Sequence, residues 1–344
     1  MGSLVRRITG ADMYPQTNWH IGGCDLGIPY VLENGSIGYL FGDTFDGPWP
    51  GGPGWRSPVM MRSAMQPSDP AFKFDSAART GTPGYAQELC YNQHDANSNH
   101  AWGQEFSVIP NDGISFPETG RQIISFQSIW SWNAGPNGSS WTSNYSSYAY
   151  SDNGNDFYRL PNFAWWNNQN NDDPYQMVSM QRDPDGYVYL ISVRAGRQYG
   201  PMMLRRVPWD QMFDMSAYQG WGWNGSNWGW GRPCSGILWG RFGEPSLRRL
   251  ADGTWVMSYA NPDYPWYLGG SAIVTRHAGR PDAVWSSEKP QQFSWQQPSN
   301  YGGFIHPWST TAANGLYLTT SRWTRDAAGN TNAYDVSLWN GSVL

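Results

Sequence analysis

Residues 22–45 read GGCDLGIPYVLENGSIGYLFGDTF, and this stretch predicts a β-hairpin. Asn34-Gly35 lies between two apolar runs, which is the strongest short-range signal for a tight hairpin turn. Asp25 and Asp43 lie equally far from this turn, one on each side. If they pair directly across the hairpin, their Cβ atoms will lie about 4.5–5.5 Å apart. Carboxyl groups that close repel each other and separate their pKa values, as acid–base catalysis requires.

Turn signals of the same kind recur along the chain, with glycines at Gly35, Gly113, Gly186, Gly253 and Gly315. Each turn is followed by a return strand and a third strand, over residues 37–41 and 58–65, 121–129 and 145–151, 187–193 and 201–207, 254–260 and 271–277, and 316–322 and 334–339. Five sets of about four strands predict an all-β fold, a five-bladed β-propeller in one domain over residues 1–344. The last set lacks an outer strand, and residues 4–9 are expected to supply it and close the ring. A β-sandwich with long insertions is the alternative.

The composition excludes several classes of protein. The 344 residues include 22 Trp and 20 Tyr, only 14% are charged, and the net charge is −5. So few charges and so many aromatic side chains are untypical of a disordered chain, and no basic run marks a nucleic-acid partner. No apolar run is long enough to span a membrane. The Trp and Tyr residues, interleaved with Asn, Gln and Ser, suit stacking on sugar rings, although most of them must fill the core.

Nothing in the sequence calls for a cofactor or a metal. Cys24, Cys90 and Cys234 lack metal-ligand spacing, the five His residues show no short ligand spacing, and no phosphate loop or dinucleotide fingerprint occurs. A hard cation held by carboxylates stays open. The N-terminus lacks the apolar stretch of a signal peptide. We therefore expect either export by another route, such as on a virus particle, or a leader that has been removed.

The innermost strands of a propeller converge on its central axis. The residues expected where these strands begin are polar: Asp25, Glu105, Asp173, Glu244 and His306. Such a cluster at one mouth is typical of a functional site. Asp25 and Asp43 are the first choice for catalysis, because glycosidic cleavage generally needs two carboxyl groups. Glu244 is the rival partner, unless it forms an ion pair with Arg241 or Arg248.

Further candidates would bind the substrate. They are Trp19, His20, Arg56, Asn144, Tyr145, Asp173, Tyr301, His306 and Trp308. Each has a structural alternative: the aromatic rings could pack in the core, and a lone His is more often a structural group than a ligand. Strand-end Asp residues, Asp173 included, could cap loops by binding backbone N–H groups.

Four segments resemble a known family: residues 22–27, 41–45, 143–146 and 301–307, which read GGCDLG, FGDTF, SNYS and YGGFIHP. They are similar to the endo-D-arabinanases of glycoside hydrolase family 183, formerly a domain of unknown function, found in actinobacteria and their phages. The resemblance covers residues 12–340. It implies a five-bladed propeller that cleaves α-D-arabinofuranosyl linkages inside mycobacterial arabinogalactan and lipoarabinomannan, acting outside the cell or from a phage particle. It also implies that Asp25 and Asp43 are the essential acidic pair, without assigning acid and base.

Other functions stay open at this point. A non-catalytic carbohydrate-binding propeller, such as a receptor-binding part of a phage, would keep the aromatic pocket without needing matched acids. A hydrolase of L-arabinan or xylan would differ only in sugar preference. Stereochemistry depends on the carboxyl separation, since about 5–5.5 Å favours retention and roughly 6.5–9.5 Å favours inversion. Adjacency of Asp25 and Asp43 favours retention, whereas Glu244 as the acid favours inversion.

Overall fold

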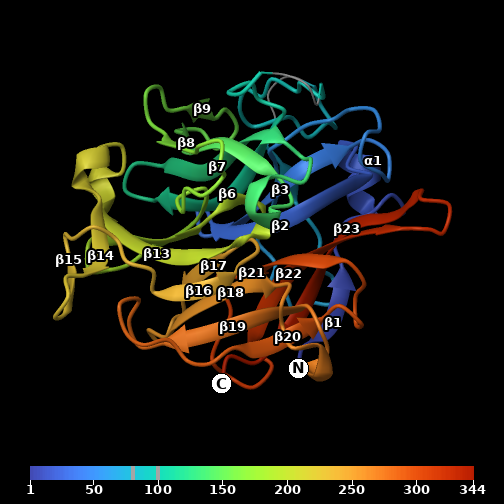
Figure 1. The fold of residues 1–344 in the computed structure, drawn as a ribbon. Coiled ribbons are helices and arrows are strands. Elements are labelled where there is room, and N and C mark those ends of the chain that lie inside the picture. Colours follow the sequence, from blue (N-terminus) through green and yellow to red (C-terminus); the bar gives the residue numbers. More distant parts are fainter. Residues whose placement is uncertain (79–81, 98–100) are drawn as a thin grey trace.

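The computed structural model describes residues 1–78, 82–97 and 101–344. Five antiparallel sheets stand around a common axis, and each forms one blade of a propeller (Figure 1). The innermost strands are β2 (Gly23–Val31), β6 (Ser107–Phe116), β11 (Met177–Arg182), β17 (Ser246–Arg249) and β21 (Asn300–Ile305). These strands contact one another in that order, and β21 contacts β2 again. The ring is closed, so the predicted five-bladed propeller is confirmed.

The remaining strands follow blade by blade. Blade one adds β3 (Ile37–Phe45), β4 (Val59–Ser63) and β5 (Ser76–Ala77). Blade two adds β7 (Arg121–Ser131), β8 (Thr142–Ser151), β9 (Tyr158–Arg159) and β10 (Trp165–Trp166). Blade three adds β12 (Tyr187–Val193), β13 (Tyr199–Pro208), β14 (Gln219–Trp223), β15 (Trp228–Trp230) and β16 (Leu238–Arg241). Blade four adds β18 (Trp255–Asn261), β19 (Ala272–Ala278) and β20 (Lys289–Phe293), and blade five adds β22 (Leu316–Arg325), β23 (Thr331–Gly341) and β1 (Ser3–Arg7).

The N-terminal strand completes the last blade, as predicted. β1 pairs antiparallel with β23, with Ser3 opposite Asn340 and Arg7 opposite Ser337. Figure 1 shows both chain ends in the same part of the molecule. Hydrogen bonds between the two ends of the chain therefore hold the ring shut. Helical segments are short: α1 (Tyr14–Trp19), η1 (Pro136–Gly138), η2 (Ala195–Arg197), η3 (Trp209–Gln211), η4 (Met215–Ala217) and η5 (Trp266–Leu268).

Within the described ranges, no helix has the length and apolar character needed to cross a membrane.

The second hairpin turn lies later than its sequence signal predicts. The prediction that Asn111-Asp112-Gly113 forms this turn is wrong, because these residues lie inside β6, at a bulge in its pairing with β7. The chain turns at residues 117–120, where the N–H of Gly120 donates to the carbonyl of Phe116 at 2.9 Å. The turn preference of Asp112 is overridden because its carboxylate is used in the core.

The buried carboxylate of Asp112 forms an ion pair with Arg248, and the contacts of this pair join four blades. Arg248 donates to both carboxylate oxygens of Asp112, at 2.7 and 2.8 Å, and to the carbonyl of Pro29 at 2.7 Å. Asp112 also accepts from the N–H of Met180 at 2.9 Å. The side chains of Arg248 and Asp112 are only 4% and 1% exposed, so water does not screen the pair. The four residues belong to β17, β6, β2 and β11, and their contacts hold these strands in register.

Candidate active site

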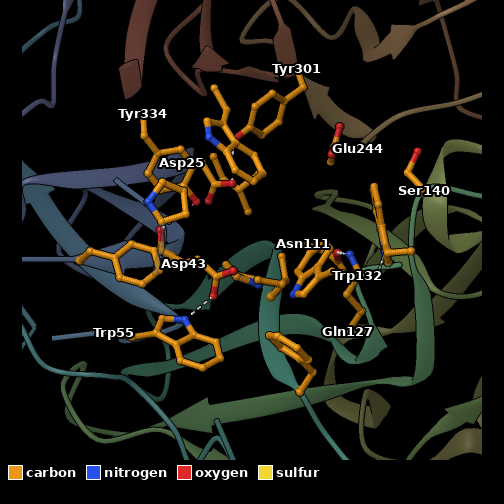
Figure 2. A pocket seen from close by; sticks show the side chains of 18 of the residues that line it. Asp25, Asp43, Trp55, Asn111, Gln127, Trp132, Ser140, Glu244, Tyr301 and Tyr334 are labelled. Carbon is orange, nitrogen blue, oxygen red and sulfur yellow. Dashed lines mark hydrogen bonds between the residues drawn. The ribbon is translucent and has the colours of Figure 1, made fainter. Parts of the chain in front are cut away.

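A cavity of about 600 Å³ opens near the starts of β2, β6 and β21. Asp25, Asp43, Glu244, Tyr301 and Tyr334 line it (Figure 2). Most of the other large side chains in the lining are aromatic: Phe45, Trp55, Phe106, Trp132, Trp141, Phe304 and Trp323. Pockets for small ligands generally measure about 300–1,000 Å³, so this cavity is the candidate site. In the part of the chain that is described, no group of three or more His, Cys, Asp and Glu side chains could hold a metal ion.

A doubly bulged strand sets the position of Asp25. The register between β2 and β3 shifts on both sides of Leu26, so Asp25 occupies a bulge. The predicted direct pairing of Asp25 with Asp43 is therefore wrong, although both line the same cavity. Leu26 adopts a φ of 67°, which is rare for a bulky side chain, and its N–H donates to Ser321 Oγ at 2.7 Å. Backbone strain beside a buried carboxyl persists only where the surrounding structure holds it, as at functional sites.

The carboxyl group of Asp25 is poised to carry a proton. Tyr301 donates its hydroxyl to Asp25 Oδ2 at 2.8 Å. Asp25 Oδ1 is buried and has no hydrogen-bond partner in the structure as described. Burial, followed by the negative charge of Asp43, raises the pKa of Asp25 to about 7. A carboxyl group with a raised pKa keeps its acid form populated closer to neutral pH, which suits a general acid.

Asp43 lies in a more polar setting. Its Oδ1 accepts from the indole N–H of Trp55 at 2.7 Å and from the hydroxyl of Ser107 at 3.0 Å. Burial raises the pKa of Asp43, but these two hydrogen bonds oppose the rise by stabilising the charged form. Two carboxyl groups whose surroundings differ in this way can divide the roles of acid and base.

Glu244 is bound by an arginine that the sequence does not point to. Arg197 donates to Glu244 Oε1 through Nη2 and, at 3.2 Å, through Nε. The alternative that Glu244 pairs with Arg241 or Arg248 is wrong, since those two bind other carboxylates. The Arg197 guanidinium also lies 5.0 Å from the ring centre of Tyr301. Glu244 therefore belongs to the wall that fixes Tyr301, and through it Asp25.

Two glycines let the chain present Tyr301 to the cavity. Gly302 and Gly303 have φ values of 77° and 105°, and the pairing of β21 with β22 shifts at this point. A Cβ on Gly303 would lie 2.4 Å from Ile273 Cγ2, so a larger residue would collide with blade four. Among the substrate-binding candidates, Tyr301 is the one that the structure brings to the two aspartates.

Several other substrate-binding candidates lie away from the cavity lining. Trp19 is buried in α1, and Arg56 donates to the carbonyls of His20 and Ala86 at 2.6 and 2.5 Å. These hydrogen bonds hold the C-terminal end of α1 and the loop around Ala86 against blade one. Asp173 accepts from a backbone N–H two residues later at 2.9 Å, which is the loop-capping alternative.

Blade two holds two more of these candidates outside the lining. Asn144 is buried and donates to the carbonyl of Gln104 at 2.9 Å. Tyr145 accepts a hydrogen bond from Arg159, which also pairs with Glu105 at 2.8 Å. The polar side chains near the start of β6, the innermost strand of blade two, therefore bind other groups of the protein.

His306 lies at the other end of its strand from the cavity. β21 runs from Asn300 to Ile305, so the prediction that His306 begins this strand is wrong. The imidazole is fully buried, lies 2.9 Å from the hydroxyl of Tyr39 and contacts the ring of Trp308. Burial, helped by the positive charge of Arg248, lowers the pKa of His306 to about 3. A neutral, enclosed His306 and its neighbour Trp308 form part of the packing.

Three further side chains shape the site, and the sequence indicates only one of them, Trp55, as a loop aromatic beside Arg56 that could stack on a sugar. Tyr334 lies on β23 and donates to the carbonyl of Asp43 at 3.1 Å. Arg197 lies in η2, and Trp55 lies in a loop directly before Arg56. Counting only the starts of innermost strands misses residues that reach the axis from loops and outer strands. An aromatic residue beside an arginine was a usable signal for Trp55, and no such signal marks Tyr334.

The fold and the site together define a class of protein, a five-bladed β-propeller whose axial cavity is lined by partly buried acidic side chains. The sequence profile of the family described as Domain of unknown function (DUF4185) matches residues 12–340, and the chain belongs to this family. This membership is compatible with the resemblance to glycoside hydrolase family 183.

Known proteins place the chain in a wider context. Notoamide biosynthesis cluster protein J′ of Aspergillus versicolor is 51% identical over 323 residues, which are 93% of this chain and 86% of that protein. An uncharacterized 35.9 kDa protein of Mycolicibacterium smegmatis is 30% identical over 169 residues, 46% of this chain and 48% of that protein. Both fungi and mycobacteria thus hold relatives, and an actinobacterial or phage origin stays a prediction.

A solved structure shares the architecture. The exo-β-1,3-galactanase of Phanerochaete chrysosporium superposes with a TM-score of 0.52 at 10% identity, covering 98% of this chain and 63% of that chain. At so low an identity the likeness shows the fold alone.

Proposed function

We propose that this protein is an endo-acting glycoside hydrolase that cleaves α-D-arabinofuranosyl linkages in D-arabinan, as found in arabinogalactan and lipoarabinomannan. The observation that carries the proposal is the presence of two partly buried carboxyl groups, Asp25 and Asp43, with different surroundings in one cavity. We place its action outside the cell, on the cell envelope, either secreted or carried on a particle. The resemblance of the Asp25, Asp43 and Tyr301 segments to family 183 supports the choice of sugar.

We assign a separate role to each acid. Asp25 gives its proton to the leaving oxygen, because its pKa near 7 keeps the acid form populated. Asp43 acts at the anomeric carbon, either directly or by taking a proton from water. Tyr301 holds Asp25 Oδ2, so the proton is expected on Oδ1, the oxygen without a partner.

The test is to incubate the purified protein with mycobacterial arabinogalactan, plant L-arabinan and xylan in parallel. We expect oligosaccharides from the first substrate alone, and proton NMR of the first-formed anomer will show retention or inversion. Binding without release would instead favour a non-catalytic carbohydrate-binding propeller. Release from L-arabinan or xylan would move the sugar preference to the plant polymers.

A second candidate is acid–base chemistry on a small molecule. It is favoured by the relative that matches almost the whole chain and is named for a notoamide biosynthesis cluster. The same two carboxyl groups would serve it. Disruption of the gene in its host separates the two: altered small-molecule products with unchanged glycan turnover would favour this candidate over the arabinanase.

The pH dependence of the reaction should follow Asp25. Burial and the charge of Asp43 raise the pKa of Asp25 to about 7, and Glu244 adds to the rise. Since the acid must hold its proton, kcat/KM should fall about tenfold for each pH unit above this pKa. Glu244→Gln removes a negative charge that favours the protonated form, so the falling limb should move to lower pH. pH–rate profiles of both proteins check this, and an unmoved limb would assign it to another group.

Gly42 leaves the room that the Asp25 carboxyl occupies. A Cβ on Gly42 would lie 2.5 Å from Asp25 Oδ1, so Gly42→Ala must displace this oxygen. We expect the rate of arabinan cleavage to fall by roughly a hundredfold, with little change in melting temperature. Gly279→Ala is the control, because a Cβ there meets no atom within 4 Å. Equal rates for the two variants would contradict this account of Asp25.

A further inference from the structure

The wall of the cavity contributed by blade two differs from the side that holds the aspartates. Figure 2 shows Asn111, Gln127 and Trp132 together, to the right of Asp43 in this view, and all of them line the cavity. Asn111 and Gln127 come from β6 and β7, and Trp132 follows β7 directly. None of these three residues carries a charge, so they cannot take part in the acid–base step. These side chains can instead affect which chemical group binds next to the glycosidic bond that is cleaved.

The amide groups on this wall are engaged with each other. Gln127 Oε1 accepts from the indole N–H of Trp141 at 3.0 Å, and Gln127 Nε2 donates to Asn111 Oδ1 at 3.3 Å. Asn111 Nδ2 donates in turn to the carbonyl of Gln176 at 3.2 Å. Gln127 is only 1% exposed. The wall therefore has little hydrogen bonding to offer the hydroxyl groups of a ligand.

What this wall does present is aromatic surface. Trp132 is 37% exposed, and its ring centre lies 5.6 Å from that of Trp141 at an interplanar angle of 53°. Phe304 lines the same cavity from blade five. Indole rings bury a large apolar area and stack on flat partners, so a planar, weakly polar ring suits this place better than a hydroxyl-rich one.

We propose that this half of the cavity is a leaving-group subsite for a planar ring with few hydroxyl groups, so that the protein also hydrolyses arabinofuranosides of aromatic alcohols. The proposal rests on the acid–base hydrolysis proposed above. Asp25 gives a proton to the oxygen of the breaking glycosidic bond, and the aromatic alcohol leaves. Water supplies the hydroxyl group at the anomeric carbon, its other proton passes to Asp43, and return of that proton to Asp25 through solvent restores both acids. The sum is one glycoside and one water giving one sugar and one alcohol.

The subsite can be tested without catalysis. Asp25→Asn protein is titrated into 4-methylumbelliferone, whose fluorescence anisotropy reports binding. Adding Trp132→Ala should weaken this binding roughly tenfold, the size of a lost stacking contact. Trp239→Ala is the control, since Trp239 is 63% exposed and does not line the cavity, and it should leave binding unchanged. Melting temperatures confirm that each variant is folded.

A second arm measures hydrolysis of 4-methylumbelliferyl α-D-arabinofuranoside by the unaltered protein. Binding that depends on Trp132, together with hydrolysis, supports the proposal. No binding of the probe, or equal loss in the Trp132 and Trp239 variants, overturns the subsite even if arabinan is cleaved. If binding depends on Trp132 but neither arabinan nor the 4-methylumbelliferyl glycoside is hydrolysed, the enzymatic function is overturned and only an aromatic binding site remains.

Discussion

Asp25→Asn should lower kcat for arabinan cleavage by roughly a thousandfold while leaving the fold intact. The amide of Asn has no acidic proton to give to the leaving oxygen. It keeps the size of Asp, and its oxygen can still accept the Tyr301 hydroxyl that now bonds Asp25 Oδ2 at 2.8 Å. Asp43→Asn should cause a loss of similar size, because it removes the carboxylate that acts at the anomeric carbon. Initial rates on mycobacterial arabinogalactan measure both, with melting temperatures as the check on folding.

The two variants should respond differently to the leaving group. A 2,4-dinitrophenyl arabinofuranoside needs no proton on its leaving oxygen, so Asp25→Asn should recover most of its rate on this substrate. Asp43→Asn should stay slow, because its defect lies at the anomeric carbon. Asp210→Asn, on an exposed residue of η3, is the control and should behave as the unaltered protein. Rescue of Asp43→Asn alone would reverse the assigned roles.

Arg248→Met should lower the free energy of unfolding by about 3–5 kcal/mol, a large share of the stability of a domain. Met fills much of the volume of Arg but leaves the buried carboxylate of Asp112 without its ion pair and the carbonyl of Pro29 without a donor. These contacts join the innermost strands of four blades, so their loss should loosen the centre of the ring. Urea unfolding followed by tryptophan fluorescence measures the change.

A surface ion pair provides the comparison for Arg248. Arg182 pairs with Glu118 at 2.7 Å, but their side chains are much more exposed, and Arg182→Met should cost about 1 kcal/mol or less. Replacing Arg248 and Asp112 together, as Met and Asn, should recover part of the loss because no buried charge is then left unpaired. If Arg248→Met does not fold, Arg248→Lys serves as the milder variant. If Arg248→Met lowers the free energy of unfolding as little as Arg182→Met does, the Arg248–Asp112 ion pair does not hold the blades together.

Local patterns in the sequence carry much of the fold. Asn34-Gly35 with apolar runs on both sides fixes the first hairpin, and comparable signals with their return strands reappear in the other blades. The β-like run at residues 4–9 supplies most of the outer strand of blade five. The exception is Asp112-Gly113, where the strongest local turn signal lies inside a strand. A buried arginine from another blade outweighs the preference of the dipeptide for a turn.

In the candidate site, local sequence patterns and contacts between blades also determine different features. The sequence by itself determined that Asp25 and Asp43 flank one hairpin and that Glu244 lies near the start of another innermost strand, because these facts follow from short-range turn and strand patterns. Only the tertiary structure decided that Asp25 occupies a bulge, that Arg197 rather than Arg241 or Arg248 binds Glu244, and that His306 is enclosed in packing. Bulges, ion pairs and burial depend on contacts between blades far apart in the chain. A repeating pattern of strands specifies how many blades there are, but it does not encode which side chains meet between them.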